Sequence, residues 1–283
     1  MSKLYTNTVV VFLLLLTSVL QWGCNVINPA EKVPTYIHID SFSFESSDLH
    51  DIRYAWVYYN NNPIGAFDLP ANVPIMTTGD GTLQITPGIP INGRAERPLG
   101  YPFYKIYSTT LKEQPGKIQT ILPTTGYYDS VKFTVISEFE GGITKFSKTK
   151  GTTSINTTSA DSLKLEGSGS GIVILSSAAD SSEDSTRTFF NVPTGAAFVE
   201  FDYNTSVNFT VGINGMLGSS VVTPVNYLAG ILPNNKWKKF YLNITSFVSL
   251  YPGGNYYLYI KTTLPTGQTN GRLLIDNIKL VTF

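Results

Sequence analysis

Few side chains of this chain have the reactivity that covalent catalysis needs. The sequence contains 2 histidines, His38 and His50, and a single cysteine, Cys24, which ends an apolar N-terminal run. This placement excludes a cysteine–histidine pair, and a Ser–His–Asp triad would have to use one of the two histidines. No nucleophile-elbow motif is present in the sequence. We therefore find no pattern that favours acyl-transfer chemistry.

Two other catalytic patterns are incomplete. The glycine run Gly167–Gly171 lacks the lysine and the following helix of a phosphate-binding loop, so we predict a turn there. A glycosidase places two carboxylates across a cleft, whereas Glu200 and Asp202 are expected on one face of one strand. We expect no hydrolytic activity and predict that the protein is not an enzyme.

One acidic segment has the alternating oxygen ligands of a calcium loop. Asp180, Ser181, Ser182, Glu183 and Asp184 lack the glycine at the sixth position and the glutamate at the twelfth that complete an EF-hand. We therefore predict a solvated acidic loop at residues 180–184.

Tyrosines in the C-terminal half are the side chains that best fit a binding function. Exposed aromatic rings can stack on the flat faces of sugars, with neighbouring amides and hydroxyls as hydrogen-bond partners. Tyr257 and Tyr259 alternate with Tyr256 and Leu258, which places tyrosines on the face away from the apolar side. The alternative is that these rings only cap the edge of a sandwich. The candidate ligand-binding residues are Tyr227, Tyr241, Tyr257 and Tyr259.

The composition indicates that β-strands position these side chains. Only 14% of the residues are charged, whereas the chain has 17 tyrosines, 16 phenylalanines, 24 glycines and 16 prolines. Aromatic residues suit pleated sheets, and glycine and proline supply turns, so we predict an all-β protein. The formal net charge is 0, which favours no nucleic-acid partner. With one cysteine, no intramolecular disulfide can form.

The N-terminus has the pattern of an export signal. Lys3 precedes an apolar run over Thr8–Leu20, and the run ends in Gln21, Trp22, Gly23 and Cys24. The run is shorter than the ~20 residues that span a bilayer and matches the core of a signal peptide. The segment resembles the lipobox of bacterial lipoproteins, although Gln21 and Trp22 depart from its preferred residues. The resemblance implies a signal peptide over residues 1–23, lipidation (palmitate) at Cys24 and a lipidated tether over residues 24–34.

Residues 35–155 are predicted to form a first β-sandwich. Residues 53–59 alternate as a strand, Asn60–Asn62 and Pro63 form a turn, and Ile64–Phe67 complete a hairpin. Residues 52–95 resemble the β-sandwich repeats of the PEGA and carboxypeptidase-regulatory type. The resemblance implies an immunoglobulin-like fold with a structural or interaction role. We place the domain boundary near residue 155, after a segment rich in Gly, Thr, Ser, Lys and Asn.

Residues 156–283 are predicted to form a jelly roll. In residues 237–244, Phe240, Leu242 and Ile244 share one face, and Lys239 and Tyr241 share the other. The order of segments resembles the galactose-binding-like jelly rolls of carbohydrate-binding modules, most specifically in the closing residues 274–278 (LIDNI). The resemblance implies that Glu166 and Asp276 match positions that hold a structural Ca²⁺ in such modules.

These features together predict a non-catalytic, lipid-anchored envelope protein. We expect it on the cell surface or the periplasmic face of the outer membrane in a Bacteroidota-type organism, where the jelly roll binds a glycan or a glycosylated surface. The alternative is an accessory protein-binding subunit of an outer-membrane secretion or uptake complex.

Overall fold

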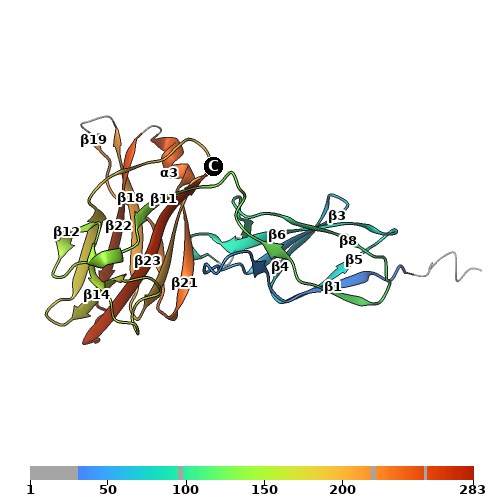
Figure 1. The fold of residues 1–283 in the computed structure, drawn as a ribbon, viewed down its shortest axis with the longest axis horizontal. Coiled ribbons are helices and arrows are strands. Elements are labelled where there is room, and N and C mark those ends of the chain that lie inside the picture. The colour runs from blue at the N-terminus through green and yellow to red at the C-terminus, as the bar shows by residue number, and fades with distance from the viewer. Residues whose placement is uncertain (1–30, 95–97, 218–220, 252–253) are drawn as a thin grey trace, which may run out of the picture.

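Strands are the main regular structure of the computed structural model, which describes residues 31–94, 98–217, 221–251 and 254–283. They form two bodies that lie one after the other along the long axis of the molecule (Figure 1). The start of β1, the first strand, lies at the end of the molecule that is far from the second body. The structure confirms the all-β prediction. The predicted signal peptide over residues 1–23 and Cys24 lie outside the described residues.

The first body contains the strands up to residue 125. They are β1 (Thr35–Ile39), β2 (Ser43–Phe44), β3 (Tyr54–Tyr59), β4 (Asn62–Asp68), β5 (Ala71–Ile75), β6 (Gly81–Pro90), β7 (Pro98–Gly100), β8 (Tyr107–Leu111), β9 (Ile118–Ile121) and β10 (Thr124–Thr125), with the 3₁₀ turn η1 (Ile91–Gly93). A sheet in the order β5-β1-β9 faces a sheet in the order β4-β3-β6-β7, in which β8 also pairs with β6. Buried aliphatic side chains from both sheets, among them Ile37, Val57 and Ile85, form its core.

The predicted hairpin at residues 53–67 is present. β3 and β4 pair antiparallel and are joined by Asn60 and Asn61, which both have positive φ, 49° and 63°. Two successive left-handed residues make the turn that matches the twist of a hairpin, and asparagine adopts this conformation more readily than most residues.

The second body contains the strands from residue 132 onward. They are β11 (Lys132–Ser137), β12 (Phe146–Gly151), β13 (Asn156–Thr158), β14 (Ser170–Ser176), β15 (Ser181–Thr186), β16 (Phe190–Asn191), β17 (Phe198–Thr205), β18 (Phe209–Leu217), β19 (Val221–Val222), β20 (Asn226–Ile231), β21 (Asn234–Asn243), β22 (Asn255–Thr263) and β23 (Asn270–Thr282), with the 3₁₀ turn η2 (Glu140–Gly142) and the helix α3 (Thr245–Leu250).

These strands make a sandwich of two antiparallel sheets. One sheet follows the order β13-β14-β23-β17-β21, with β11 also on β23. We call it the inner sheet, because its outer face meets the first body. The other follows β12-β15-β22-β18-β19, with β16 on β22 and β20 on β18. We call it the distal sheet. Alternating side chains of both sheets, such as Leu242 and Leu258, fill the core between them.

Strand pairing changes from the first body to the second between residues 125 and 132. β11 pairs with β23, and β12 pairs with β15, so both belong to the sandwich. This transition comes earlier than the boundary near residue 155 that the composition suggested. Residues 141–160 are polar because β12 is an edge strand whose side chains after Phe146 are exposed.

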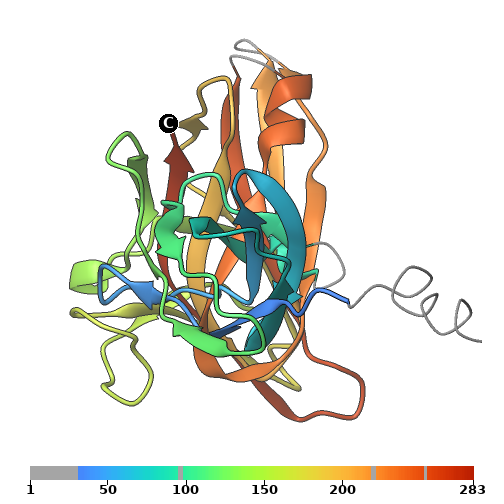
Figure 2. The same cartoon turned by 90° about the vertical axis from the view of Figure 1, so that its right-hand side faces the viewer.

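Aromatic side chains join the two bodies. Tyr101, Phe103 and Tyr104 of the first body pack against Phe198 and Tyr241 on the outer face of the inner sheet. The Tyr101 ring makes edge contacts with Phe198 and Tyr241, at centroid distances of 5.1 Å and 5.0 Å. Figure 2, which looks along the long axis, shows the first body in front of this sheet. The distal sheet therefore presents its outer face away from the first body.

Candidate functional site

Three of the four candidate tyrosines lie on the outer face of the distal sheet. Tyr259 of β22 pairs with Gly212 of β18, and Gly212 pairs with Tyr227 of β20. Because neighbouring strands are about 4.8 Å apart, the two tyrosine positions flank Gly212 at about 10 Å from each other. Tyr257 is two residues before Tyr259 and so shares its face. The fold brings together residues that are 32 positions apart in the sequence.

The Tyr227 ring extends over Gly212 toward the next strands. A Cβ atom at Gly212 would lie 2.9 Å from Cδ1 of Tyr227, so the ring occupies the space that a side chain there would fill. The Tyr227 hydroxyl donates a hydrogen bond to Glu183, and burial followed by the Glu183 charge raises the pKa of Tyr227 to about 12. The residue nevertheless keeps 39% of its surface exposed. The ring is thus fixed at its hydroxyl end and open to solvent.

Glu183 is the carboxylate that the neighbouring polar side chains of this face contact. It is buried, yet Lys150 Nζ lies 3.8 Å from its Oε1 and Lys261 Nζ lies 3.9 Å from its Oε2. Lys261 Nζ is also 5.8 Å from the centre of the Tyr227 ring. We define Tyr227, Tyr257, Tyr259, Glu183 and Lys261, with Gly212 beneath them, as the tyrosine face.

The prediction of a solvated acidic loop at residues 180–184 is wrong. Residues 181–186 form β15, which pairs with β12 on one side and β22 on the other. Glu183 points to the outer face, and Asp184 points to the interior, where burial raises its pKa. This strand lacks the alternation of polar and apolar residues by which a strand is predicted. Ser182 and Thr186 share the inward face with Asp184, and both are small and polar.

Aromatic and amide groups continue the tyrosine face beyond Tyr259. Phe189, which is exposed, makes an edge contact with Tyr257 at a centroid distance of 6.4 Å and an interplanar angle of 80°. Asn214 of β18 pairs with Tyr257 and donates through Nδ2 to the Tyr259 hydroxyl at 3.3 Å. Rings and hydroxyls therefore lie next to one another on this face, with the buried amide of Asn214 beneath them.

Tyr241 does not belong to this face, contrary to its prediction as a ligand-binding residue. It lies on the inner sheet and is only 1% exposed. Its hydroxyl is 2.8 Å from that of Tyr104 and accepts a hydrogen bond from the backbone N–H of Asp51 at 3.1 Å. The alternation in β21 does place Tyr241 away from the sandwich core, but the first body covers that outer face.

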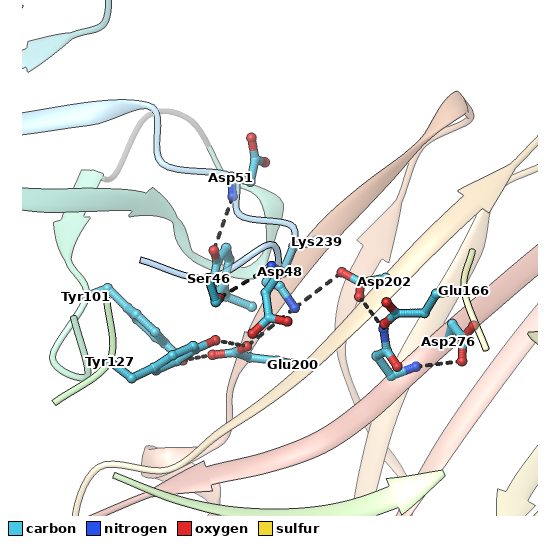
Figure 3. Close-up of polar contacts among 12 residues, drawn as sticks. Ser46, Asp48, Asp51, Tyr101, Tyr127, Glu166, Glu200, Asp202, Lys239 and Asp276 are labelled. Atoms are coloured by element: carbon cyan, nitrogen blue, oxygen red, sulfur yellow. Dashed lines mark hydrogen bonds and ion pairs between the residues drawn. The ribbon is translucent and has the colours of Figure 1, made fainter. Parts of the chain in front are cut away.

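A buried charge cluster lies beside Tyr241 at the junction of the two bodies (Figure 3). Glu200 accepts hydrogen bonds from the hydroxyls of Tyr101 and Tyr127, the second at 2.6 Å. Lys239 Nζ lies 3.7 Å from Glu200 and 3.3 Å from Asp202. Burial opposes the charge of Lys239, but the two carboxylates together raise its pKa above that of free lysine. The three charged groups hold one another in place, and the bond from Tyr101 to Glu200 links the first body to the inner sheet.

A groove of about 470 Å³ opens next to the cluster, between residues 47–49 of the first body and β11 and β23 of the second. Asp202, Lys239 and Asn277 line it, and Asn277 donates through Nδ2 to Asp202 at 3.1 Å and to Glu166 at 2.6 Å. Asn277 has a φ of 51°, which aims its amide at both carboxylates from a bulge in β23. Glu166, Asp202, Lys239 and Asn277 are thus bonded to one another along the groove.

The two residues that resemble calcium ligands make other contacts. Asp276 accepts hydrogen bonds from the Ser170 hydroxyl at 2.5 Å and from the Asn277 N–H at 2.9 Å, and Glu166 accepts from the Asn277 amide. In the part of the chain that the structure describes, no group of three or more His, Cys, Asp or Glu residues could hold a metal ion. A Ca²⁺ ion at Glu166 and Asp276 stays a prediction from the resemblance.

Asp276 predicts a pH dependence of stability. Burial raises the pKa of its carboxyl to about 6, above that of an unfolded aspartate. The folded chain therefore binds a proton that the unfolded chain has already lost, and stability falls as the pH rises from about 4 to 6. Asp276→Asn should remove this fall and raise the free energy of unfolding at pH 7 by about 1–3 kcal/mol. Urea denaturation at pH 4, 5, 6 and 7 would measure it. If the stability of the parent and of Asp276→Asn fell equally with rising pH, Asp276 would not be the cause of the pH dependence.

Comparison with known proteins gives structural neighbours only. No protein-family model matches the sequence, and no curated protein matches it. A carbohydrate-binding module of the β-sandwich superfamily matches 89% of this chain and 99% of its own, at 13% identity and a TM-score of 0.39. A xylan-binding domain of Paenibacillus barcinonensis matches 52% of this chain and 98% of its own, at 12% identity and a TM-score of 0.39. The enzymatically active domain of a bacteriophage CBA120 tailspike matches 52% of this chain at 14% identity and a TM-score of 0.40, and the match spans 21% of the tailspike chain.

The described residues include no helix that is long and apolar enough to cross a membrane.

Proposed function

We propose that this protein binds a polysaccharide through the tyrosine face of its distal sheet. One observation carries the proposal: the Tyr227 ring extends over Gly212, is held by Glu183, and leaves 39% of the residue open to solvent. A ring fixed in advance loses little side-chain freedom when a sugar stacks on it. Tyr259 and Tyr257 extend the surface, and the tyrosine hydroxyls can exchange hydrogen bonds with sugar hydroxyls.

The orientation of the bodies supports this use of the distal sheet. The first body covers part of the outer face of the inner sheet through Tyr101, Phe103 and Tyr104, so that face is not free for a polymer. The tyrosine face points away from the first body, and the chain enters the first body at the opposite end of the molecule (Figure 1). A lipid at Cys24 would hold that end at the outer membrane and direct the tyrosine face outward. Membrane attachment, exposure to the cell exterior and a non-catalytic role are parts of the same proposal.

Replacement of Tyr227 tests the proposal. The purified protein should be retarded in native gels that contain its polysaccharide, and Tyr227→Ala should weaken the affinity about tenfold, a loss of about 1.4 kcal/mol. Tyr227→Phe keeps the ring but loses the bond to Glu183, so it should bind with an intermediate affinity.

A matched control uses an exposed residue of the first body that is not aromatic. Thr110 lies in β8, where Thr82 is its partner, and its side chain is exposed, so Thr110→Ala should leave the retardation unchanged. If no polysaccharide in a broad panel retards the protein, or if Tyr227→Ala is retarded as strongly as the parent, the proposed function is wrong. If no polysaccharide retards the protein but an outer-membrane protein co-purifies with it, the result would instead support the alternative of an accessory protein-binding subunit.

A further inference from the structure

We propose that the polysaccharide bound at the tyrosine face is acidic, with carboxylate or sulfate groups along its backbone. This inference rests on the proposed function and specifies its ligand. It depends on the distribution of charge around Glu183, at the edge of the distal sheet formed by β12 and β15.

Glu183 is outnumbered by the cations that contact it. Lys150 and Lys261 both pair with this one carboxylate, at 3.8 Å and 3.9 Å, and their side chains are 78% and 48% exposed. The Tyr227 hydroxyl uses the same carboxylate as its acceptor. One negative charge cannot neutralise two ammonium groups, so positive charge remains beside the Tyr227 ring.

Further cations lie on the same edge. Lys145, Lys148 and Arg187 are exposed next to or within β12 and β15, and the backbone N–H of Arg187 donates to Lys145. Among the acids of this edge, Asp184 is buried and points inward, where Lys148 is its register partner, and Asp180 keeps its negative charge while it accepts hydrogen bonds from Thr152 and Ser181. Lys145, Lys150, Lys261 and Arg187 still outnumber Asp180 and Glu183. The whole chain has equal numbers of acidic and basic residues, 20 of each. This excess of positive charge is therefore a local feature of the edge.

The geometry places this charge where a stacked polymer would meet it. Lys261 follows Tyr259 by two residues on the same face, and its Nζ lies 5.8 Å from the centre of the Tyr227 ring. A sugar stacked on Tyr227 would carry its substituents within reach of Lys261, and the next sugars along the sheet would pass toward Lys150. Repeated acidic groups would then meet several ammonium groups at once, and dissolved salt would screen the attraction.

The test compares charged and uncharged forms of the same backbone. The probes are polygalacturonate against its methyl ester and dextran sulfate against dextran, so that the carboxylate and the sulfate are examined separately. At about 20 mM NaCl the protein should bind the charged member of at least one pair about tenfold more tightly, and the preference should disappear at about 500 mM NaCl.

Variants assign the preference to this site. Lys150→Gln combined with Lys261→Gln should abolish the preference, and Tyr227→Ala should reduce binding to the charged polymer. Lys117→Gln, an exposed lysine of the first body, should change neither.

The outcomes separate this inference from the proposed function. Equal, Tyr227-dependent binding of charged and uncharged polymers would overturn the acidic ligand and leave the proposed function intact. Binding of the charged polymer that is insensitive to Tyr227→Ala would also overturn it, because the contact would then lie elsewhere. The absence of binding to all four probes and to neutral polysaccharides would refute both.

Discussion

Replacing Lys239 by methionine should destabilise the protein by about 3–5 kcal/mol, the largest stability effect that we expect from a single substitution. The Lys239 side chain is 1% exposed and lies between two carboxylates that are 0% and 2% exposed. Methionine fills most of the same volume but carries no charge. Glu200 and Asp202 would then be buried next to each other with no cation, and buried charge without a partner is one of the most costly arrangements in a protein.

The loss of stability in Lys239→Met should be measurable by chemical denaturation and should depend on pH. Burial already raises the pKa of Asp202, and removal of the Lys239 charge would raise it further. In Lys239→Met the cluster would be tolerated only when a carboxyl is protonated, so the variant should recover stability as the pH falls from about 7 to 5. Asp202→Asn in the same chain should restore part of the lost stability at pH 7, because it removes one of the two uncompensated charges.

Lys236→Met is the matched control, since this residue lies in the same strand but is exposed. It should change the free energy of unfolding by less than about 0.5 kcal/mol. Equal losses for Lys236→Met and Lys239→Met would show that the strand, and not the charge cluster, determines the effect. The absence of any recovery at lower pH would show that unpaired carboxylates are not the cause.

Local periodicity predicted the strand at β21 and which of its sides faces the sandwich core, but it did not predict β15. Phe240 and Leu242 of β21 and the next residue, Ile244, point inward, as their alternation with Lys239 and Tyr241 indicates. Periodicity cannot show whether the opposite side is solvated. Tyr241 and Lys239 are on that opposite side and are buried, because the first body covers it.

The tyrosine face was only partly predictable for a related reason. Tyr257 and Tyr259 are neighbours in the sequence, so their shared face follows from the alternation in β22. Tyr227 joins them only through the register of β18 with β20 and β22, which single-strand patterns do not specify. Gly212 and Glu183 had no sequence signal as site residues, because a glycine in a strand and an acidic segment each have common explanations in turns and loops.

Gly212→Ala should weaken polysaccharide binding at least tenfold and lower stability by about 1–3 kcal/mol. Gly212 does not have the positive φ that would exclude alanine, so the backbone can accept the new residue. The added Cβ would lie 2.9 Å from Tyr227 Cδ1 and 3.0 Å from both the Asn226 carbonyl oxygen and Val225 Cγ1. The ring must therefore move away from the sheet, which breaks the bond between its hydroxyl and Glu183 and tilts the stacking surface.

Gly230→Ala is the control for this substitution. Gly230 lies in β20 and pairs with Thr210, and a Cβ atom there would meet only Thr210 Cγ2, at 3.9 Å. Gly230→Ala should leave binding and stability nearly unchanged. This result would separate an effect of the Tyr227 ring from a general effect of losing a glycine in this sheet.

A double variant shows whether Gly212 acts through Tyr227. In a Tyr227→Ala chain the ring is absent, so Gly212→Ala should cause no further loss of binding and a smaller loss of stability than in the parent. The remaining cost would come from Val225 and the Asn226 carbonyl. Fully additive losses would mean that Gly212 and Tyr227 contribute independently. In that case the ring does not depend on the glycine beneath it, and the tyrosine face is not the fixed surface from which the polysaccharide site is inferred.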